Sequence, residues 1–227
     1  MSRPDHVRRS RRQVGARTYE RIVVKTQWLT EEDDIGEVML THLGELAHVD
    51  DLAIVSEKAV IITSGRAIPA SHVSAGRLAR ALARRVRPVA NSRGLSIPEK
   101  MQYVLDDVGV ARVLLATLVA SVTRPFGLRG AFYLIAGETA RSLDGMRPPL
   151  ENFLLPPLNR HDARSIALRI QKHIGIPVAI VDINDRGGSV RAISAGDLGA
   201  AQLREILSDN PLGQRDESTP IGLVRRL

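Results

Sequence analysis

Two carboxylates and an amide side chain follow an apolar segment late in the chain. The apolar run covers 178–181, and Asp182, Asn184 and Asp185 come directly after it. Oxygen donors of this kind are the ligands of Mg²⁺ and Mn²⁺, which also bind substrate phosphates. Ligands of open α/β sheets bind beyond the carboxyl ends of strands, so a metal site at this point is one hypothesis. A polar turn that ends the strand is the other.

Two cations follow an apolar segment near the start of the chain. Lys58 comes two residues after the run 52–56, and Arg66 follows Gly65. A lysine is a compact point charge suited to phosphate, and an arginine can hold a phosphate or carboxylate with two hydrogen bonds. The chain has only four lysines. We therefore interpret Lys58 and Arg66 as candidate ligands of a nucleotide phosphate, with two surface cations at a turn as the alternative.

Two further side chains could join a metal site. Asp144 precedes Gly145, and Gln214 lies in a segment between a predicted helix and the last predicted strand. Both positions are also typical of ordinary turns and connections. The sequence contains neither a Walker-type phosphate loop nor a His-Glu-x-x-His zinc motif, and it contains no cysteine. The absence of cysteine excludes disulfides, thiolate metal sites and cysteine nucleophiles.

The composition is that of a globular protein with an aliphatic core. The chain has 227 residues, of which 44% are hydrophobic and 3% aromatic. This length suits one large domain or two small ones. The most apolar run, 113–122, has about half the length needed to cross a bilayer. Since the N-terminus does not read as a signal peptide, we expect a cytoplasmic protein without membrane contact.

The positive charge is concentrated at the N-terminus. Residues 1–21 contain seven arginines against Asp5 and Glu20, so they carry +5 of the net charge of +7. We predict a disordered basic tail over 1–18 and an α/β domain over 19–227, and this domain could consist of two subdomains. Binding of nucleic acid by this tail is not expected, because no aromatic residue precedes Tyr19 to stack on a base.

The hydrophobic periodicity predicts a mixture of helices and strands without strict alternation. Strands are expected at 19–27, 51–56, 131–136, 177–181, 190–194 and 220–225. Helices are expected from about residue 31, at 74–86, from 96, at 110–122, at 161–173 and at 197–207. The helix 110–122 should be largely buried. Residues 57–63 stay open between helix and strand, with their β-branched residues favouring a strand, and 145–160 should be a long loop. This pattern favours an α/β or α+β fold whose mixed sheet is partly antiparallel.

Taken in order, these motifs resemble the coenzyme F-420 gamma-glutamyl ligase family over residues 19–226. The resemblance is carried by Glu32-Asp33-Asp34-Ile35, Lys58-Ala59-Val60-Ile61, Ser64-Gly65-Arg66, Ala136-Gly137, Asp182-Ile183 and the set Gly213, Gln214, Glu217 and Pro220. It implies a GTP-dependent amide ligase with a two-metal site, which phosphorylates a carboxylate before an amino acid attacks it. It also implies a gamma-glutamyl ligase-like fold and a homodimer.

The resemblance assigns roles to particular residues. Lys58 would contact the nucleotide phosphates, Asp182 and Gln214 would hold Mg²⁺ or Mn²⁺, and Asp144 would join them. The chain departs from the family pattern at Ile183, where the family has a threonine ligand, and at Ser64, where it has a glutamate. The loop after Asp182 is also shorter. These departures leave a second hypothesis, a non-catalytic module that binds a nucleotide or an anion on the same fold.

Overall fold

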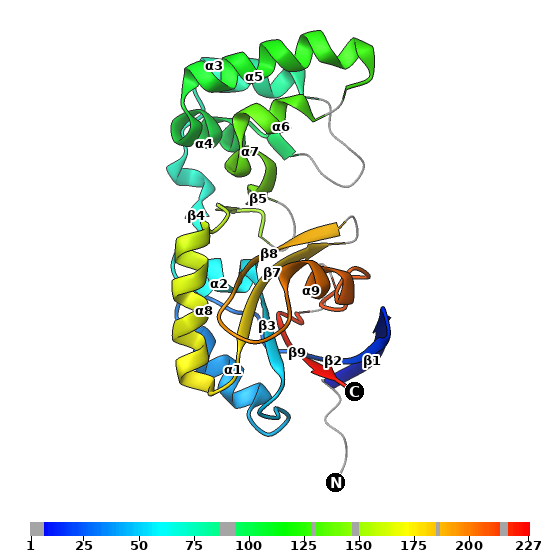
Figure 1. Ribbon diagram of the computed structural model, residues 1–227. Coiled ribbons are helices and arrows are strands. Elements are labelled where there is room, and N and C mark those ends of the chain that lie inside the picture. Colours follow the sequence, from blue (N-terminus) through cyan, green and yellow to red (C-terminus); the bar gives the residue numbers. More distant parts are fainter. Residues whose placement is uncertain (1–6, 87–93, 129, 147–149, 185–186, 214–217) are drawn as a thin grey trace. The chain divides into compact units, whose positions relative to one another are not determined.

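The computed structural model describes residues 7–86, 94–128, 130–146, 150–184, 187–213 and 218–227. The chain divides into two compact units. The sheet unit comprises residues 1–66 and 158–227, and the helical unit comprises residues 67–157 (Figure 1). Each unit has its own buried core, so each is described separately.

The described part of the sheet unit is built on a six-stranded mixed sheet. Its strand order is β1 (Val7–Val14), β2 (Arg17–Val24), β9 (Ile221–Arg226), β3 (Leu52–Ser56), β7 (Val178–Asn184) and β8 (Gly187–Ile193). Strands β3 and β7 run parallel, and the other neighbouring pairs run antiparallel. The predicted α/β class with a partly antiparallel sheet is therefore confirmed.

Helices cover both faces of this sheet. Figure 1 shows α1 (Ile35–Leu43) and α8 (Arg160–Ile174) on the opposite side from α9 (Ala200–Ile206). Helix α2 (Glu57–Thr63) contacts β7, and α9 contacts β1 and β8. The central strands are buried on both faces, as in β3, where Ala53, Ile54 and Val55 have no exposed surface. This is why their sequences are continuous apolar runs instead of alternating ones.

The basic N-terminal segment is a strand where we predicted disorder. Residues 7–14 pair along their whole length with β2, so the expected tail over 1–18 is wrong from residue 7 onward. Residues 1–6 lie outside the described part. Strand alternation explains how the arginines are accommodated. The Nη2 groups of Arg8 and Arg12 donate to the Pro211 carbonyl at 2.6 Å and to the Ser208 hydroxyl at 3.0 Å.

Arg21, on the neighbouring strand β2, makes a similar contact from a buried position. Its Nη1 donates to the Ile206 carbonyl at 3.0 Å and pairs with Asp209. The α9 segment thus supplies oxygen acceptors that the sequence pattern did not reveal. The opposite face of β1 carries the exposed Arg9 and Arg11. Because β1 is the edge strand, these charges protect the sheet from pairing with another chain.

Two other predictions are refined by the structure. Residues 57–63, which the sequence left open, form helix α2 in spite of their β-branched side chains; Ala59, Val60 and Ile61 are buried, and α2 contacts β3 and β7. The first helix begins at Ile35 instead of residue 31. Asp34 caps it by accepting from the backbone N–H groups of Gly36 and Glu37, whereas Thr30 and Asp33 close a turn before it.

The helical unit contains α3 (Arg77–Arg85), α4 (Pro98–Val108), α5 (Val110–Thr123), α6 (Ala131–Ala136) and α7 (Glu138–Ser142). Short 3₁₀ turns occur at Ala70–His72, Gly94–Ser96 and Arg124–Phe126. A small sheet joins β4 (Ile68–Pro69), β6 (Phe153–Leu155) and β5 (Asp144–Gly145), so the predicted loop 145–160 contains a strand. The core of the helical unit is formed by residues such as Leu82, Met101, Val104, Val113 and Leu154.

Two predictions in the helical unit need correction. Residues 131–136 form helix α6 in place of the expected strand; Gly130 and Gly137, both at positive φ, flank it, and α6 packs against α5. Helix α5 is present as predicted, but it is not largely buried. Val113 and Ala116 are buried, while Leu114, Leu115 and Leu118 are exposed by 44%, 54% and 62%.

Within the described residues, no helix has both the length and the apolar character needed to cross a membrane.

Candidate functional site

Strands β3 and β7 end at the same edge of the sheet. They run parallel in a register that pairs Ser56 with Val181, so the residues that follow these two positions lie beside each other. On the β3 side these residues are Glu57 and Lys58, and on the β7 side they begin with Asp182. This is the edge at which ligands of parallel sheets usually bind.

A third segment, from the C-terminal part of the chain, reaches the same edge. Strand β9 starts here, since it pairs antiparallel with β3 and Val55 lies opposite Ile221. The Ser56 N–H donates to the carbonyl of Pro220 at 2.8 Å, just before β9 begins. We call the group formed by residues 57–58, 182–184 and 218–220 the carboxyl edge.

A buried arginine of β8, Arg191, lies between two carboxylates of the carboxyl edge. The Nε of Arg191 lies 2.9 Å from Oε2 of Glu57, and its Nη2 lies 3.3 Å from Oδ2 of Asp182. The other Glu57 oxygen accepts the Leu158 N–H at 2.8 Å. Glu57 is 4% exposed, whereas the Asp182 side chain is 29% exposed. Arg191 therefore holds an interior carboxylate on one side and a solvent-facing one on the other.

Burial controls the protonation of Glu57. Loss of solvent raises the pKa of the Glu57 carboxyl above its ordinary value of 4.5, and the neighbouring Asp182 charge raises it further. Arg191 and the Leu158 N–H oppose this shift because they stabilise the ionised form. The net direction is upward, so the folded protein binds this proton more tightly than the unfolded chain does.

The raised pKa of Glu57 predicts a pH dependence of stability. A group whose pKa is higher in the folded state stabilises the fold fully below its unfolded pKa, and this contribution is lost as the pH rises through the folded value. We therefore expect Glu57→Gln to gain stability relative to the unmodified protein as the pH rises from 4.5 toward neutrality. Urea unfolding of both proteins at several pH values measures this difference. A difference that stays constant, or that changes in the opposite direction, would contradict the burial argument.

The predicted phosphate ligands have different surroundings. Lys58 is the second residue of α2 and is partly exposed at the carboxyl edge. Arg66 instead forms an ion pair with Asp162 in the first turn of α8. This contact lowers the pKa of the Asp162 carboxyl, chiefly because the Arg66 guanidinium donates a hydrogen bond to it. Lys58 thus lies at the candidate site, and Arg66 lies in a surface ion pair.

The predicted metal ligands fall into three groups. Asp182 lies at the carboxyl edge. Asp144 belongs to the helical unit, where its carboxylate accepts the Gly145 N–H at 2.9 Å. Asp185 and Gln214 lie outside the described residues. Over the part of the chain that the structure describes, no group of three or more His, Cys, Asp or Glu side chains is placed to hold a metal ion.

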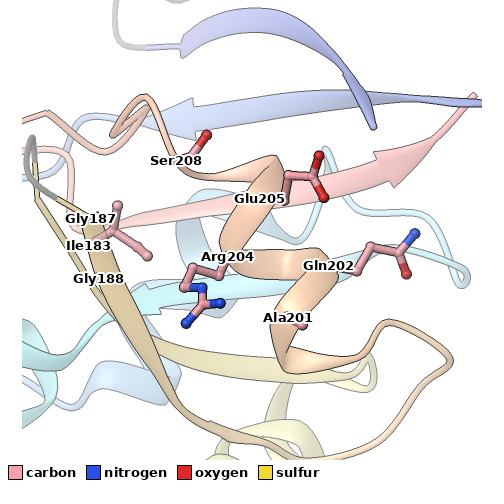
Figure 2. A pocket seen from close by; sticks show the side chains of 8 residues that line it. All are labelled: Ile183, Gly187, Gly188, Ala201, Gln202, Arg204, Glu205 and Ser208. Carbon is pink, nitrogen blue, oxygen red and sulfur yellow. The ribbon is translucent and has the colours of Figure 1, made fainter. Parts of the chain in front are cut away.

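A pocket lies on the other face of the same sheet. It has a volume of about 570 Å³ and is lined by Ile183, Gly187, Gly188, Ala201, Gln202, Arg204, Glu205 and Ser208 (Figure 2). Ile183 packs toward α9, and side chains alternate along a strand, so Asp182 points to the opposite face. The pocket and the two carboxylates therefore belong to different faces of the sheet.

Sequence reasoning missed two members of the site. Glu57 was passed over because it stood beside Lys58 without a spacing pattern of its own, and Arg191 is one of many arginines. A charged residue directly after an apolar strand is a usable signal, since Glu57 and Asp182 both occupy that position. For Arg191, the signal appears with the β7–β8 pairing, which places it close to Asp182.

Comparisons with protein-family models and with curated proteins gave no match for this chain. The family resemblance therefore rests on the motifs themselves.

Proposed function

We propose that the protein is a GTP- and divalent-metal-dependent amide ligase that activates a carboxylate as an acyl phosphate. The observation that supports this most is the parallel pairing of β3 with β7, which brings Lys58 and Asp182 to one edge of the sheet. The segment that precedes β9 reaches the same edge at Pro220, six residues after Gln214. These are the motifs that carry the resemblance to the gamma-glutamyl ligases.

The reaction has two steps. A carboxylate oxygen of the acid substrate attacks the γ-phosphorus of GTP, the bond to the β–γ bridging oxygen breaks, and GDP leaves. The amino group of the second substrate then attacks the carbonyl carbon of the acyl phosphate. Inorganic phosphate leaves, the nitrogen loses a proton, and the amide is formed. Activation is required because a free carboxylate is a poor electrophile.

The residues of the carboxyl edge have distinct roles in this proposal. The Lys58 ammonium neutralises phosphate charge as the phosphoryl group is transferred. Asp182 and Asn184 are hard oxygen donors of the kind that Mg²⁺ and Mn²⁺ require, and a bound cation would neutralise the same charge from the other side. Arg191 orients the Asp182 carboxylate through the contact at 3.3 Å. Glu57, which contacts Nε of the same guanidinium, holds Arg191 in place.

One observation favours a second candidate, a module that binds a nucleotide or anion without turnover. Arg191 already neutralises Asp182 at 3.3 Å, which weakens the attraction of that carboxylate for a cation. Ile183, where the family has a threonine ligand, supplies no side-chain oxygen. The formation of GDP from bound GTP separates the two candidates, because the ligase needs it and the binding module does not produce it.

Thermal unfolding in the presence of GTP and Mn²⁺ tests the proposal. A ligand that binds the folded state alone stabilises it, by about 2.7 kcal/mol at a concentration 100 times its Kd. We expect a higher Tm for the unmodified protein and the loss of most of this shift in Lys58→Ala. Lys172→Ala removes an exposed lysine from the last turn of α8 and should keep the shift in full. No shift in the unmodified protein at millimolar GTP and Mn²⁺ would overturn both the ligase and a module that binds GTP, and equal shifts in the two variants would remove Lys58 from the site.

A further inference from the structure

A further segment, which follows strand β2, leaves the sheet at the carboxyl edge. Val24, the last residue of β2, lies opposite Ile221 of β9, and Ile221 lies opposite Val55 of β3. Because β2 and β3 both run antiparallel to β9, they point the same way. The residues that follow Val24 therefore leave the sheet at the same edge as those that follow Ser56.

Hydrogen bonds hold this segment against the one that precedes β9. The Thr26 N–H donates to the Ser218 carbonyl at 2.9 Å, and the Ser218 hydroxyl donates to the Gln27 carbonyl at 3.2 Å. Residues 218–220 belong to the carboxyl edge, so the backbone of Thr26 and Gln27 is held there. Trp28 comes directly after them.

Trp28 presents an aromatic ring to solvent. It is 53% exposed, and it is the only tryptophan in the chain. Among the described residues, its ring meets no other aromatic ring and its indole N–H has no hydrogen-bond partner. The sequence of the sheet unit contains one other Phe, Tyr or Trp residue, Tyr19, which is fully buried. Of these two rings, Trp28 is therefore the one that a ligand can reach.

The strand order sets the distance between Trp28 and the proposed phosphate site. Neighbouring strands lie about 4.8 Å apart, so the end of β2 is about 10 Å from the end of β3 and about 14 Å from β7. The ribose and the phosphate chain of an extended nucleotide can bridge such a separation. A base at Trp28 would thus direct the phosphates across the start of β9 toward Lys58 and Asp182.

We propose that Trp28 stacks on the base of the nucleotide whose phosphates bind near Lys58. This inference rests on the proposed nucleotide site, and it adds a base-binding residue that belongs to none of the motifs carrying the family resemblance. Every base has a π-face, so stacking on an aromatic side chain tolerates different bases. Trp28 therefore contributes affinity for GTP and for ATP alike, and a preference between the two comes from other residues.

Fluorescence measures the stack directly, because Trp28 is the only tryptophan. GTP with Mg²⁺ should quench its emission in a saturable way. Inorganic triphosphate with Mg²⁺ has a phosphate chain and no base, so it should compete with GTP and leave the emission of the protein unchanged. Emission that does not change in saturating GTP, or that inorganic triphosphate quenches as strongly as GTP does, would refute the stack.

Calorimetric titration tests the same residue without fluorescence. We expect Trp28→Ala to bind GTP and ATP about ten-fold more weakly than the unmodified protein, and Trp28→Phe to lose less. Inorganic triphosphate should bind Trp28→Ala and the unmodified protein equally, because it has no base to stack. Phe126→Ala is the matched control, since it removes a 79% exposed ring from the helical unit and should keep the full affinity for GTP.

The outcomes separate this inference from the proposed function. If neither GTP nor ATP binds the unmodified protein, both are wrong. If GTP binds Trp28→Ala as tightly as it binds the unmodified protein, the stack is refuted and the proposed function stands. Equal losses in Trp28→Ala and Phe126→Ala would also refute the stack, because the loss would not depend on the carboxyl edge. Thermal unfolding without ligand checks that both variants are folded.

Discussion

Replacing Arg191 by methionine should lower the free energy of unfolding by about 3–5 kcal/mol, the usual cost of removing one partner from a buried ion pair. The Arg191 side chain is 8% exposed and lies between Glu57 and Asp182. Its removal leaves the Glu57 carboxylate in the interior beside a second negative charge. Methionine keeps much of the apolar volume, so the loss reports on charge more than on packing.

Urea unfolding at neutral pH measures this loss, and Arg66→Met is its matched control. Arg66 also pairs with a carboxylate, Asp162, but its side chain is 45% exposed. Water screens such a pair, so Arg66→Met should change stability little. The additional substitution Glu57→Gln should recover part of the Arg191→Met loss, because it removes the stranded charge. Equal losses at Arg191 and Arg66 would show that the buried cluster contributes no more than a surface contact.

The central strands of the fold could be predicted from the sequence with little ambiguity. The apolar run 178–181 can be a strand buried on both faces, and in the structure it is the first part of β7, which continues to Asn184. Helix α8 was equally clear from its periodicity. These elements are determined by local pattern, and the sheet they form is the mixed one that was expected.

Elements that depend on distant partners could not be predicted in this way. Seven arginines over 1–21 favoured a disordered tail, but residues 7–14 pair with β2, and one carbonyl and one hydroxyl after α9 accept from Arg8 and Arg12. Helix α2 forms in spite of the strand preference of its β-branched residues, and Ala59, Val60 and Ile61 are buried in its packing contacts. In both cases tertiary contacts outweigh local propensity.

In the candidate site, too, single residues could be predicted from local sequence, whereas their neighbours in space could not. The sequence identified Lys58 and Asp182 separately, and the pairing of β3 with β7 is what brings them to one edge. Arg191 could not be distinguished from other arginines before the sheet was known, and the one sequence signal for Glu57 was its place directly after an apolar run. Asp144 was expected beside them and lies in the helical unit, while Asp185 and Gln214 stay predictions because they fall outside the described residues.

Asp182→Ala should reduce the affinity for GTP with Mn²⁺ by at least about a hundred-fold. This carboxylate is the donor at the carboxyl edge that is both partly exposed and held by a buried guanidinium. Loss of a residue that only orients a metal ligand already costs about ten- to a hundred-fold in metal affinity, so loss of the ligand itself should cost at least the upper end of that range. Asp182→Asn keeps the size and one oxygen, so it should lose less affinity than Asp182→Ala.

The variant must be folded for this comparison to hold, since Asp182 also contacts Arg191. Thermal unfolding without ligand provides that check. Asp197→Ala is the matched control, because it removes an exposed carboxylate from the segment between β8 and α9. It should leave both the stability and the nucleotide affinity unchanged.

Calorimetric titration of GTP with Mn²⁺ into the unmodified protein, Asp182→Ala and Asp197→Ala is the most direct test of a nucleotide–metal site at the carboxyl edge. We predict binding to the unmodified protein and to Asp197→Ala with the same affinity, and loss of binding in a folded Asp182→Ala. Undiminished affinity in Asp182→Ala would show that any nucleotide binds elsewhere, and the proposed site would be wrong.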